Sequence, residues 1–237
     1  MSTSINFIRW SKRTILRLGI HKIIPARLFT KIGYTSYLSK WIRSNRPTFS
    51  SFPFNGFNGG LRYNLYEHLF STQDINGPID YLEFGVATGT SFIWWEKKIT
   101  HEDAVFHGFD TFTGLPEDWG HFKKGDMSSN NEKPTIEGNR HHWYQGLFQV
   151  TLPKFLKDYS GDRKKIIHLD ADLFSSTLYV LTSLSPYLKK GDIIMFDEFN
   201  VPMDEFRAFQ DWVDSYYIEY EVIGEVNNYY QTAIKIK

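Results

Sequence analysis

The sequence predicts an α/β protein with a doubly wound, mostly parallel sheet of seven strands, a helical arm at the N-terminus and an antiparallel hairpin at the C-terminus. Three observations support this prediction. Short apolar runs alternate with segments of helical periodicity, which is typical of parallel sheets. A glycine-rich turn follows the first apolar run, where a strand must turn sharply into a helix. Two final apolar runs are separated by Asn227 and Asn228, which is typical of a hairpin.

The expected elements can be placed along the chain by these patterns. In order, they are a helix at 61–70, a strand at 79–84, a helix through Phe92 and Trp95, strands at 104–109 and 165–169, a helix at 176–188, a strand at 192–196, a helix at 203–213, and the hairpin strands YEVIGEV and YQTAIKIK. Residues 117–139 are polar and without periodicity. A loop of this length predicts a lid over a binding site or a mobile insertion.

The overall composition suits one large soluble domain. The chain has 237 residues, of which 41% are hydrophobic and 17% aromatic, and it has no cysteine. Disulfides, thiolate metal sites and cysteine nucleophiles are therefore excluded. A segment rich in Ser, Pro, Asn and Gly, residues 44–60, predicts a linker between an arm at 1–60 and a domain at 61–237. No apolar run is long enough for a spanning helix or resembles a signal peptide, so we expect a cytoplasmic protein.

The N-terminal arm carries a separate signal. Its first 50 residues contain ten Lys or Arg and no acid, interleaved with apolar residues, and predict short amphipathic helices broken at Pro25 and Gly33. Two interpretations stay open: peripheral contact with an anionic membrane, or packing on the domain or on a second subunit of a homodimer. Nucleic acid is disfavoured, because the rest of the chain has 17 basic against 27 acidic residues and would repel phosphate.

The turn after the first strand predicts a nucleotide-like ligand. Residues 83–91 read EFGVATGTS, and glycines at such a turn let a ligand approach the backbone. The dinucleotide pattern GxGxxG is absent. Asp110, followed by Thr111, ends the next strand. A carboxylate at this position can accept hydrogen bonds from both hydroxyls of a ribose. Alternatively, Asp110 caps its own turn. The candidate contacts in the glycine-rich turn are Glu83, Gly85, Ala87, Thr88, Gly89 and Ser91.

Acidic residues follow two further strands. Asp170 and Asp172 end one strand, and Asp197 and Glu198 end the next. Adjacent parallel strands lie about 4.8 Å apart, so these carboxylates should meet and repel unless a cation or a proton intervenes. Magnesium suits oxygen ligands of this kind. Asp172 has an alternative interpretation as a helix cap.

Four histidines are further candidates. His107, His141, His142 and His168 could each ligate a metal, or could be ordinary core and surface histidines.

Five motifs occur in order between Tyr81 and Asn200: YLEFGVATGTS, FDTFTGLPE, YQGLFQVTLP, HLDADLFSST and MFDEFN. With them the chain resembles class I S-adenosylmethionine-dependent methyltransferases, which have a Rossmann-like fold, and within these the macrocin O-methyltransferase family. Two positions depart from the family pattern, Val150 where an acid is usual and Glu198 where an Asp is frequent. The resemblance implies S-adenosylmethionine across Glu83 to Gly89 with Asp110 on the ribose, the residues Gln145, Gly146 and Phe148 near the adenine, and Mg²⁺ on Asp170, Asp197 and Glu198.

The predicted reaction is metal-assisted methylation of a hydroxyl on a sugar, a glycosylated metabolite or a polysaccharide. The acceptor oxygen attacks the methyl group in line, and a base takes its proton. Asp170 is the first candidate for this base, with His168 and His142 as alternatives. Two other functions remain open: methylation of a catechol-like phenol, and a non-catalytic binding protein that keeps the methyltransferase fold. A nicotinamide oxidoreductase is disfavoured by the missing fingerprint.

Overall fold

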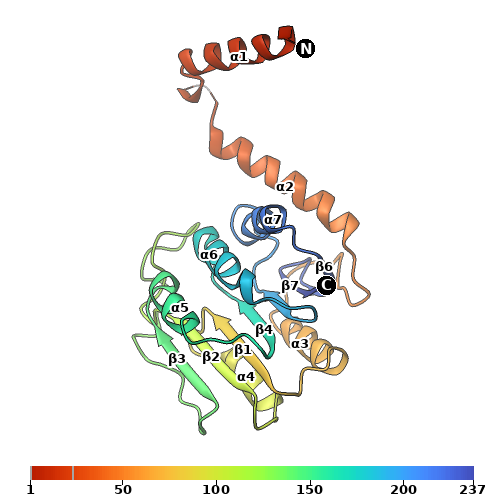
Figure 1. Ribbon diagram of the computed structural model, residues 1–237, viewed down its shortest axis with the longest axis vertical. Helices are drawn as coiled ribbons and strands as arrows, with labels where there is room; N and C mark the ends of the chain where they lie inside the picture. The colour runs from red at the N-terminus through yellow and green to blue at the C-terminus, as the bar shows by residue number, and fades with distance from the viewer. Residues whose placement is uncertain (1, 23) are drawn as a thin grey trace.

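The computed structural model describes residues 2–22 and 24–237, and it confirms the predicted seven-stranded sheet (Figure 1). Its strands are β1 (Ile79–Phe84), β2 (Val105–Asp110), β3 (His141–Gln145), β4 (Lys164–Leu169), β5 (Ile193–Phe196), β6 (Tyr220–Val226) and β7 (Gln231–Ile236). They lie in the order β3-β2-β1-β4-β5-β7-β6. The first five are parallel, and β7 pairs antiparallel with both β5 and β6.

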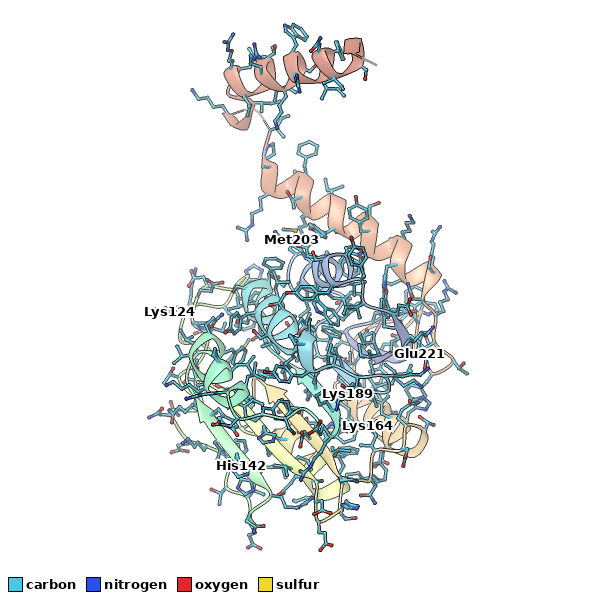
Figure 2. All side chains as sticks on the ribbon, viewed as in Figure 1. Lys124, His142, Lys164, Lys189, Met203 and Glu221 are labelled. Carbon is cyan, nitrogen blue, oxygen red and sulfur yellow. The ribbon has the colours of Figure 1, made fainter. Side chains whose placement is uncertain are left out.

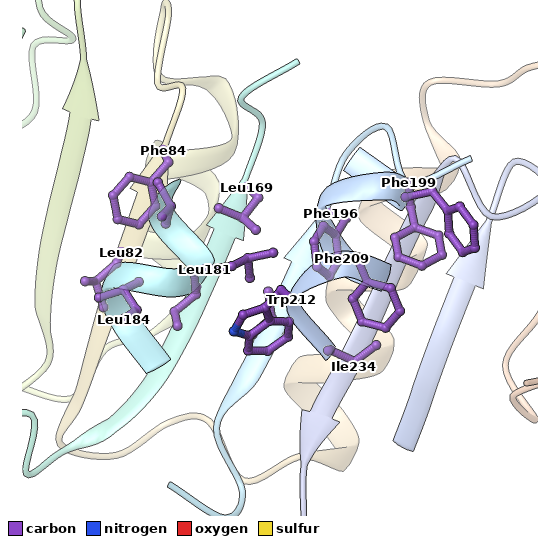
Figure 3. Packing of buried hydrophobic residues seen from close by; sticks show 14 of the residues in the cluster. Leu82, Phe84, Leu169, Leu181, Leu184, Phe196, Phe199, Phe209, Trp212 and Ile234 are labelled. Carbon is purple, nitrogen blue, oxygen red and sulfur yellow. The ribbon is translucent and has the colours of Figure 1, made fainter. Parts of the chain in front are cut away.

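Helices cover both faces of this sheet. The α-helices are α1 (Ser2–Arg17), α2 (Ala26–Ser44), α3 (Leu61–Thr72), α4 (Thr90–Lys98), α5 (Phe148–Leu156), α6 (Phe174–Leu184) and α7 (Glu205–Tyr216), with short 3₁₀ turns at Ile20–Lys22 and Ser185–Tyr187. Side chains of α3 and α4 pack with one face, and those of α5, α6 and α7 with the other. Figure 3 shows the hydrophobic cluster on the face covered by α5, α6 and α7. There Leu82 of β1 and Phe196 of β5 pack in one cluster with Leu181 of α6 and Trp212 of α7.

The N-terminal arm divides into a docked part and a free part. The end of α2 belongs to the core, because Trp41 is buried among Phe199, Phe209 and Tyr229. Burying a side chain of this size stabilises by about 3 kcal/mol. Helix α1, by contrast, lies away from the sheet (Figure 1).

Three features differ from the predictions made on the sequence. Helix α2 runs through Gly33 without a break, because an interior glycine costs only about 1 kcal/mol, although Pro25 does precede the helix. The residues of β3 and α5 were not predicted as elements. The first reads HHWYQ at a sheet edge, with no buried residue and no apolar run, and the second contains Pro153.

The predicted linker at 44–60 is fastened to the C-terminal hairpin. The amide of Phe52 donates to the Glu225 carboxylate at 2.8 Å, and that of Phe54 to the Asn228 side chain at 2.8 Å. A domain boundary at residue 60 therefore stays a prediction. Among the described residues, no helix combines the length and apolar character needed to cross a bilayer.

Candidate active site

The carboxyl ends of four strands lie side by side, as the sequence predicts. Phe84 at the end of β1 is paired with Phe109 of β2 and with Leu169 of β4, and Leu169 is paired with Phe196 of β5. Residues that follow these strands therefore share one edge of the sheet. The order of the strands reverses between β1 and β4, which is where ligands bind in open α/β sheets.

The turn after β1 requires its glycines. Gly85 has a φ of +95°, and a Cβ at this position would lie 1.7 Å from the backbone oxygen of Asp170. Gly89 has a φ of +81°, and its Cβ would lie 2.5 Å from Pro134. The loop between β2 and β3, predicted as a lid over 117–139, therefore packs directly on this turn.

Asp110 organises both neighbouring turns. Its Oδ2 accepts hydrogen bonds from the amides of Val86 at 2.7 Å and Ala87 at 2.8 Å, and its Oδ1 accepts one from Phe112 at 2.6 Å. Asp110 therefore does cap its turn, as the alternative interpretation of the sequence expects. The same carboxylate also lines a pocket, so contact with a ligand stays open to it.

That pocket has a cavity volume of about 120 Å³ and is partly open to solvent. Five predicted donor contacts line it: Gly85, Ala87, Asp110, Thr111 and Phe148. Asp170 and Asp172 also reach it. Gln145 and Gly146 line an adjoining recess that shares Thr111. The strand ends predicted from the sequence therefore account for six of the fifteen residues that line the pocket.

Several lining residues were missed by sequence reasoning: Leu115, Pro116, Met127, Leu147, Gln149 and Ser176. Leu115 and Pro116 lie within the motif FDTFTGLPE, which was the available signal. Met127 belongs to the polar loop, whose path no local pattern predicts.

Other predicted contacts lie outside the pocket, in a buried polar network beneath the turn. Glu83 accepts a hydrogen bond from the Tyr81 hydroxyl, and His168 Nδ1 lies 3.0 Å from that hydroxyl. The Tyr66 hydroxyl lies 3.4 Å from both Ser91 Oγ and His168 Nε2. Glu83, Ser91 and His168 therefore support the turn from inside the protein. Glu83 and Ser91 were expected to contact the methyl donor and His168 to act in catalysis, but none of the three lines the pocket.

Thr88 and Gly89 lie on the same turn but do not line the pocket. The Thr88 side chain is exposed, and its hydroxyl lies 3.4 Å from that of Thr90.

The remaining histidines are also away from the pocket. His142 is an exposed residue near the start of β3, on the far side of the domain from Met203 (Figure 2). Its ring lies 5.7 Å from that of His107. His141 Nδ1 lies 3.6 Å from Glu96. The structure thus corrects the proposed catalytic role of His142, because strand residues three positions before the carboxyl end do not reach the site.

Buried His107 makes the stability of the fold dependent on pH. Burial lowers its pKa from 6.5 to about 3, and His142 adds to this. The unfolded chain binds this proton more readily, so stability present at neutral pH is lost as pH falls below about 6.5 toward 3. We expect His107 to reduce the free energy of unfolding by about 2 kcal/mol between pH 7 and pH 5.

Urea unfolding of the wild type and of His107→Gln at these two pH values measures the effect. The glutamine variant should lose about 2 kcal/mol less on acidification. Equal losses in both proteins would contradict the assignment.

The acidic residues form a cluster behind the pocket. Burial raises the pKa of the Asp170 carboxyl well above its usual range, and Asp197 and Asp172 add to this. Burial likewise raises the pKa of Asp172 to about 6 and that of Glu198 to about 8. Raised pKa values favour the protonated, neutral carboxyls, which reduces the repulsion that the sequence predicts.

The positive charge of an arginine side chain reduces this repulsion further. Arg62 Nη2, at the start of α3, lies 2.7 Å from Asp197 Oδ2. Sequence reasoning missed Arg62, since 135 residues separate it from its partner. The other oxygen of Asp197, and Oε2 of Glu198, are buried and have no hydrogen-bond partner. Within residues 2–22 and 24–237, Asp170, Asp197 and Glu198 do not converge into a three-ligand metal group.

A larger groove lies next to the pocket. The segment 172–176 separates the two, because Asp172 and Ser176 line the pocket and Phe174 lines the groove. Its walls come from the first turns of α2, from the loop at 117–120 and from residues 201–204, next to Met203 in Figure 2. The indole nitrogen of Trp119 donates to Asp204 at 3.2 Å, and the Arg207 guanidinium lies 3.9 Å from the centre of the Phe174 ring. The groove therefore combines aromatic faces with charged hydrogen-bonding groups.

Comparison with known families identifies the central part of the chain. Residues 82–199, about half of the sequence, match the family described as "Methyltransferase domain". This part of the chain is a methyltransferase domain. The narrower resemblance to the macrocin O-methyltransferase family stays a prediction.

Solved methyltransferase structures share the fold. The calicheamicin methyltransferase CalS11 is 19% identical, with a TM-score of 0.53 over 86% of this chain and 91% of its own. The O-methyltransferase NovP is 19% identical, with a TM-score of 0.55 over 73% and 78%. Another structure of CalS11, described as a TDP-rhamnose 3'-O-methyltransferase, is 19% identical and gives 0.52 over 86% and 93%. No protein of curated function matches the sequence.

Proposed function

We propose that the protein is an S-adenosylmethionine-dependent O-methyltransferase acting on a hydroxyl of a sugar or a glycosylated metabolite or polysaccharide. One observation carries this proposal. Asp170 lines the same pocket as the turn at Gly85 and as Asp110, so a candidate base and a nucleoside cradle share one space. The fold shared with a sugar O-methyltransferase supports it.

The chain's own residues supply orientation and a base. The donor brings a methyl group on a positively charged sulfur, which leaves as a thioether when the methyl is transferred. The acceptor oxygen forms its bond to the methyl carbon as the carbon–sulfur bond breaks, and its proton passes to Asp170. In its ionised form this carboxylate is a better proton acceptor than an exposed aspartate, because burial raises its pKa. Loop residue Met127 also lines the pocket.

The groove favours a sugar over a catechol-like phenol as the acceptor. Trp119 and Phe174 offer aromatic faces, and Arg27, Asp204 and Arg207 offer charged donors and acceptors for several hydroxyls. A planar phenol needs a narrow apolar slot, whereas many hydroxyls need many polar partners. Ser175 lines the groove and Ser176 lines the donor pocket, so the two sites lie next to each other along this segment.

Magnesium is part of the proposal, because the donor set suits it. Two buried carboxylate oxygens, Asp197 Oδ1 and Glu198 Oε2, have no partner, and oxygen is the ligand this ion prefers. Asp197 and Glu198 would hold it, and it would lower the pKa of the acceptor hydroxyl. Asp170, the third ligand expected from the sequence, does not converge with them in the described chain and stays the base. A bound ion has to compete with Arg62 for Asp197.

Calorimetry with S-adenosylmethionine tests the donor site. Asp110→Ala removes the acceptor of three turn amides and the proposed ribose contact, and each hydrogen bond to a charged group is worth about 1.5–3 kcal/mol. We expect the variant to bind about ten- to a hundredfold more weakly than the wild type. Glu102→Ala, at an exposed acid, is the matched control and should bind normally. A wild type that does not bind the donor would refute the function itself.

A further inference from the structure

Helix α1 is amphipathic along its whole length. Arg9, Arg13 and Arg17 recur every four residues and share one face, whereas Ile8 and Ile15 lie on the opposite face. The apolar side chains are exposed: Phe7 retains 67% of its accessible surface and Ile8 retains 61%. Fold formation thus leaves this apolar face uncovered.

Nothing in the described chain holds α1 against the α/β body. Its side-chain hydrogen bonds are internal, from Ser11 to Phe7 and from Thr14 to Trp10, and no ion pair joins its described residues to the sheet or its helices. The rings of Phe7 and Trp10 stack on each other with centroids 6.2 Å apart. Figure 1 shows the helix standing clear of the domain. It is therefore free to bind an external surface.

The charge of the arm specifies an anionic surface. Residues 1–50 contain ten basic residues and no acid, so a second copy of the arm would repel the first. The exposed large apolar residues of the body, such as Phe57, Phe122 and Tyr217, come from separate segments of the chain. An anionic bilayer surface accepts both faces of the helix at once, with acyl chains for the apolar side and headgroups for the arginines.

We propose that α1 binds the surface of a membrane containing anionic lipid, lying in the interface with Ile8 and Ile15 toward the acyl chains. Trp10 lies between the two faces, a position suited to the headgroup level. The first turns of α2, which begins at Ala26 after α1 has ended at Arg17, line the groove through Arg27 and Lys31. The same arm thus connects the lipid surface with the proposed acceptor groove.

Sedimentation of the full chain with vesicles tests the apolar face. Vesicles of phosphatidylcholine mixed with phosphatidylglycerol should bind the wild type. Ile8→Ser combined with Ile15→Ser should weaken binding at least about tenfold, because two buried apolar side chains are lost. Leu16→Ser is the matched control, since Leu16 is an equally exposed apolar residue on the basic face, and it should bind within about twofold of the wild type.

The basic face has its own test. Arg13→Gln and Arg17→Gln should each weaken binding roughly fivefold, and added salt should weaken it further. Equal binding to vesicles of phosphatidylcholine alone would overturn the proposal. So would wild-type binding by the double serine variant. A dimer in analytical ultracentrifugation that this variant dissociates would assign the apolar face to a second copy instead. Methyl transfer to a soluble acceptor should be unchanged in all variants, because α1 lies outside the active site.

Discussion

Gly85→Ala is expected to destabilise the protein by about 4 kcal/mol or more and to abolish methyl transfer. The added Cβ would lie 1.7 Å from the backbone oxygen of Asp170, so the ends of β1 and β4 would have to separate. The φ of +95° adds strain, since L side chains rarely adopt it. Urea unfolding of the variant, with donor calorimetry beside it, measures both losses.

Gly191→Ala is a matched control for this experiment. Gly191 has nearly the same φ, +94°, but a Cβ there meets nothing within 4 Å. It should therefore lose only the strain energy, about 1–2 kcal/mol. If the two variants lose the same stability, the close approach of Gly85 to Asp170 is not as described.

Asp170→Asn should reduce the rate of methyl transfer by about a thousandfold, the loss expected when a general base is removed. Donor affinity should stay near the wild-type value. Stability at neutral pH should not fall, because the substitution relieves repulsion with Asp197 and Asp172, the groups that help burial to raise the pKa of Asp170. Asp158→Asn, an exposed surface change, serves as the control. A rate within tenfold of the wild type would exclude Asp170 as the base.

The same assay tests the proposed magnesium. EDTA should reduce the wild-type rate, and added Mg²⁺ should restore it. A rate unaffected by EDTA would remove the metal from the mechanism and leave the donor site and Asp170 untouched. The ion pair between Arg62 and Asp197 would then be the resident neutralising contact of the cluster.

The sites that could be predicted share one property: they follow from where a strand ends. The periodicity of apolar residues located β1, β2, β4 and β5, and parallel strands must end at a common edge. Gly85, Asp110 and Asp170 could therefore be assigned to one pocket before any coordinates were known. The roles of His168 and Glu83 could not be predicted in this way. Side chains alternate between the two faces of a strand, and the alternation does not indicate which face contacts the ligand.

The sequence alone determined six of the seven strands, with the hairpin among them, the glycine-rich turn and the charge of the arm, because these depend on local spacing and composition. Only the tertiary structure decided which partners the acids have, that Met127 and Leu115 line the pocket, and that the end of α2 docks while α1 stays free. The physical reason is that such contacts join residues far apart in the chain. Arg62 meets Asp197, and Trp41 meets Phe209, only after the core has packed.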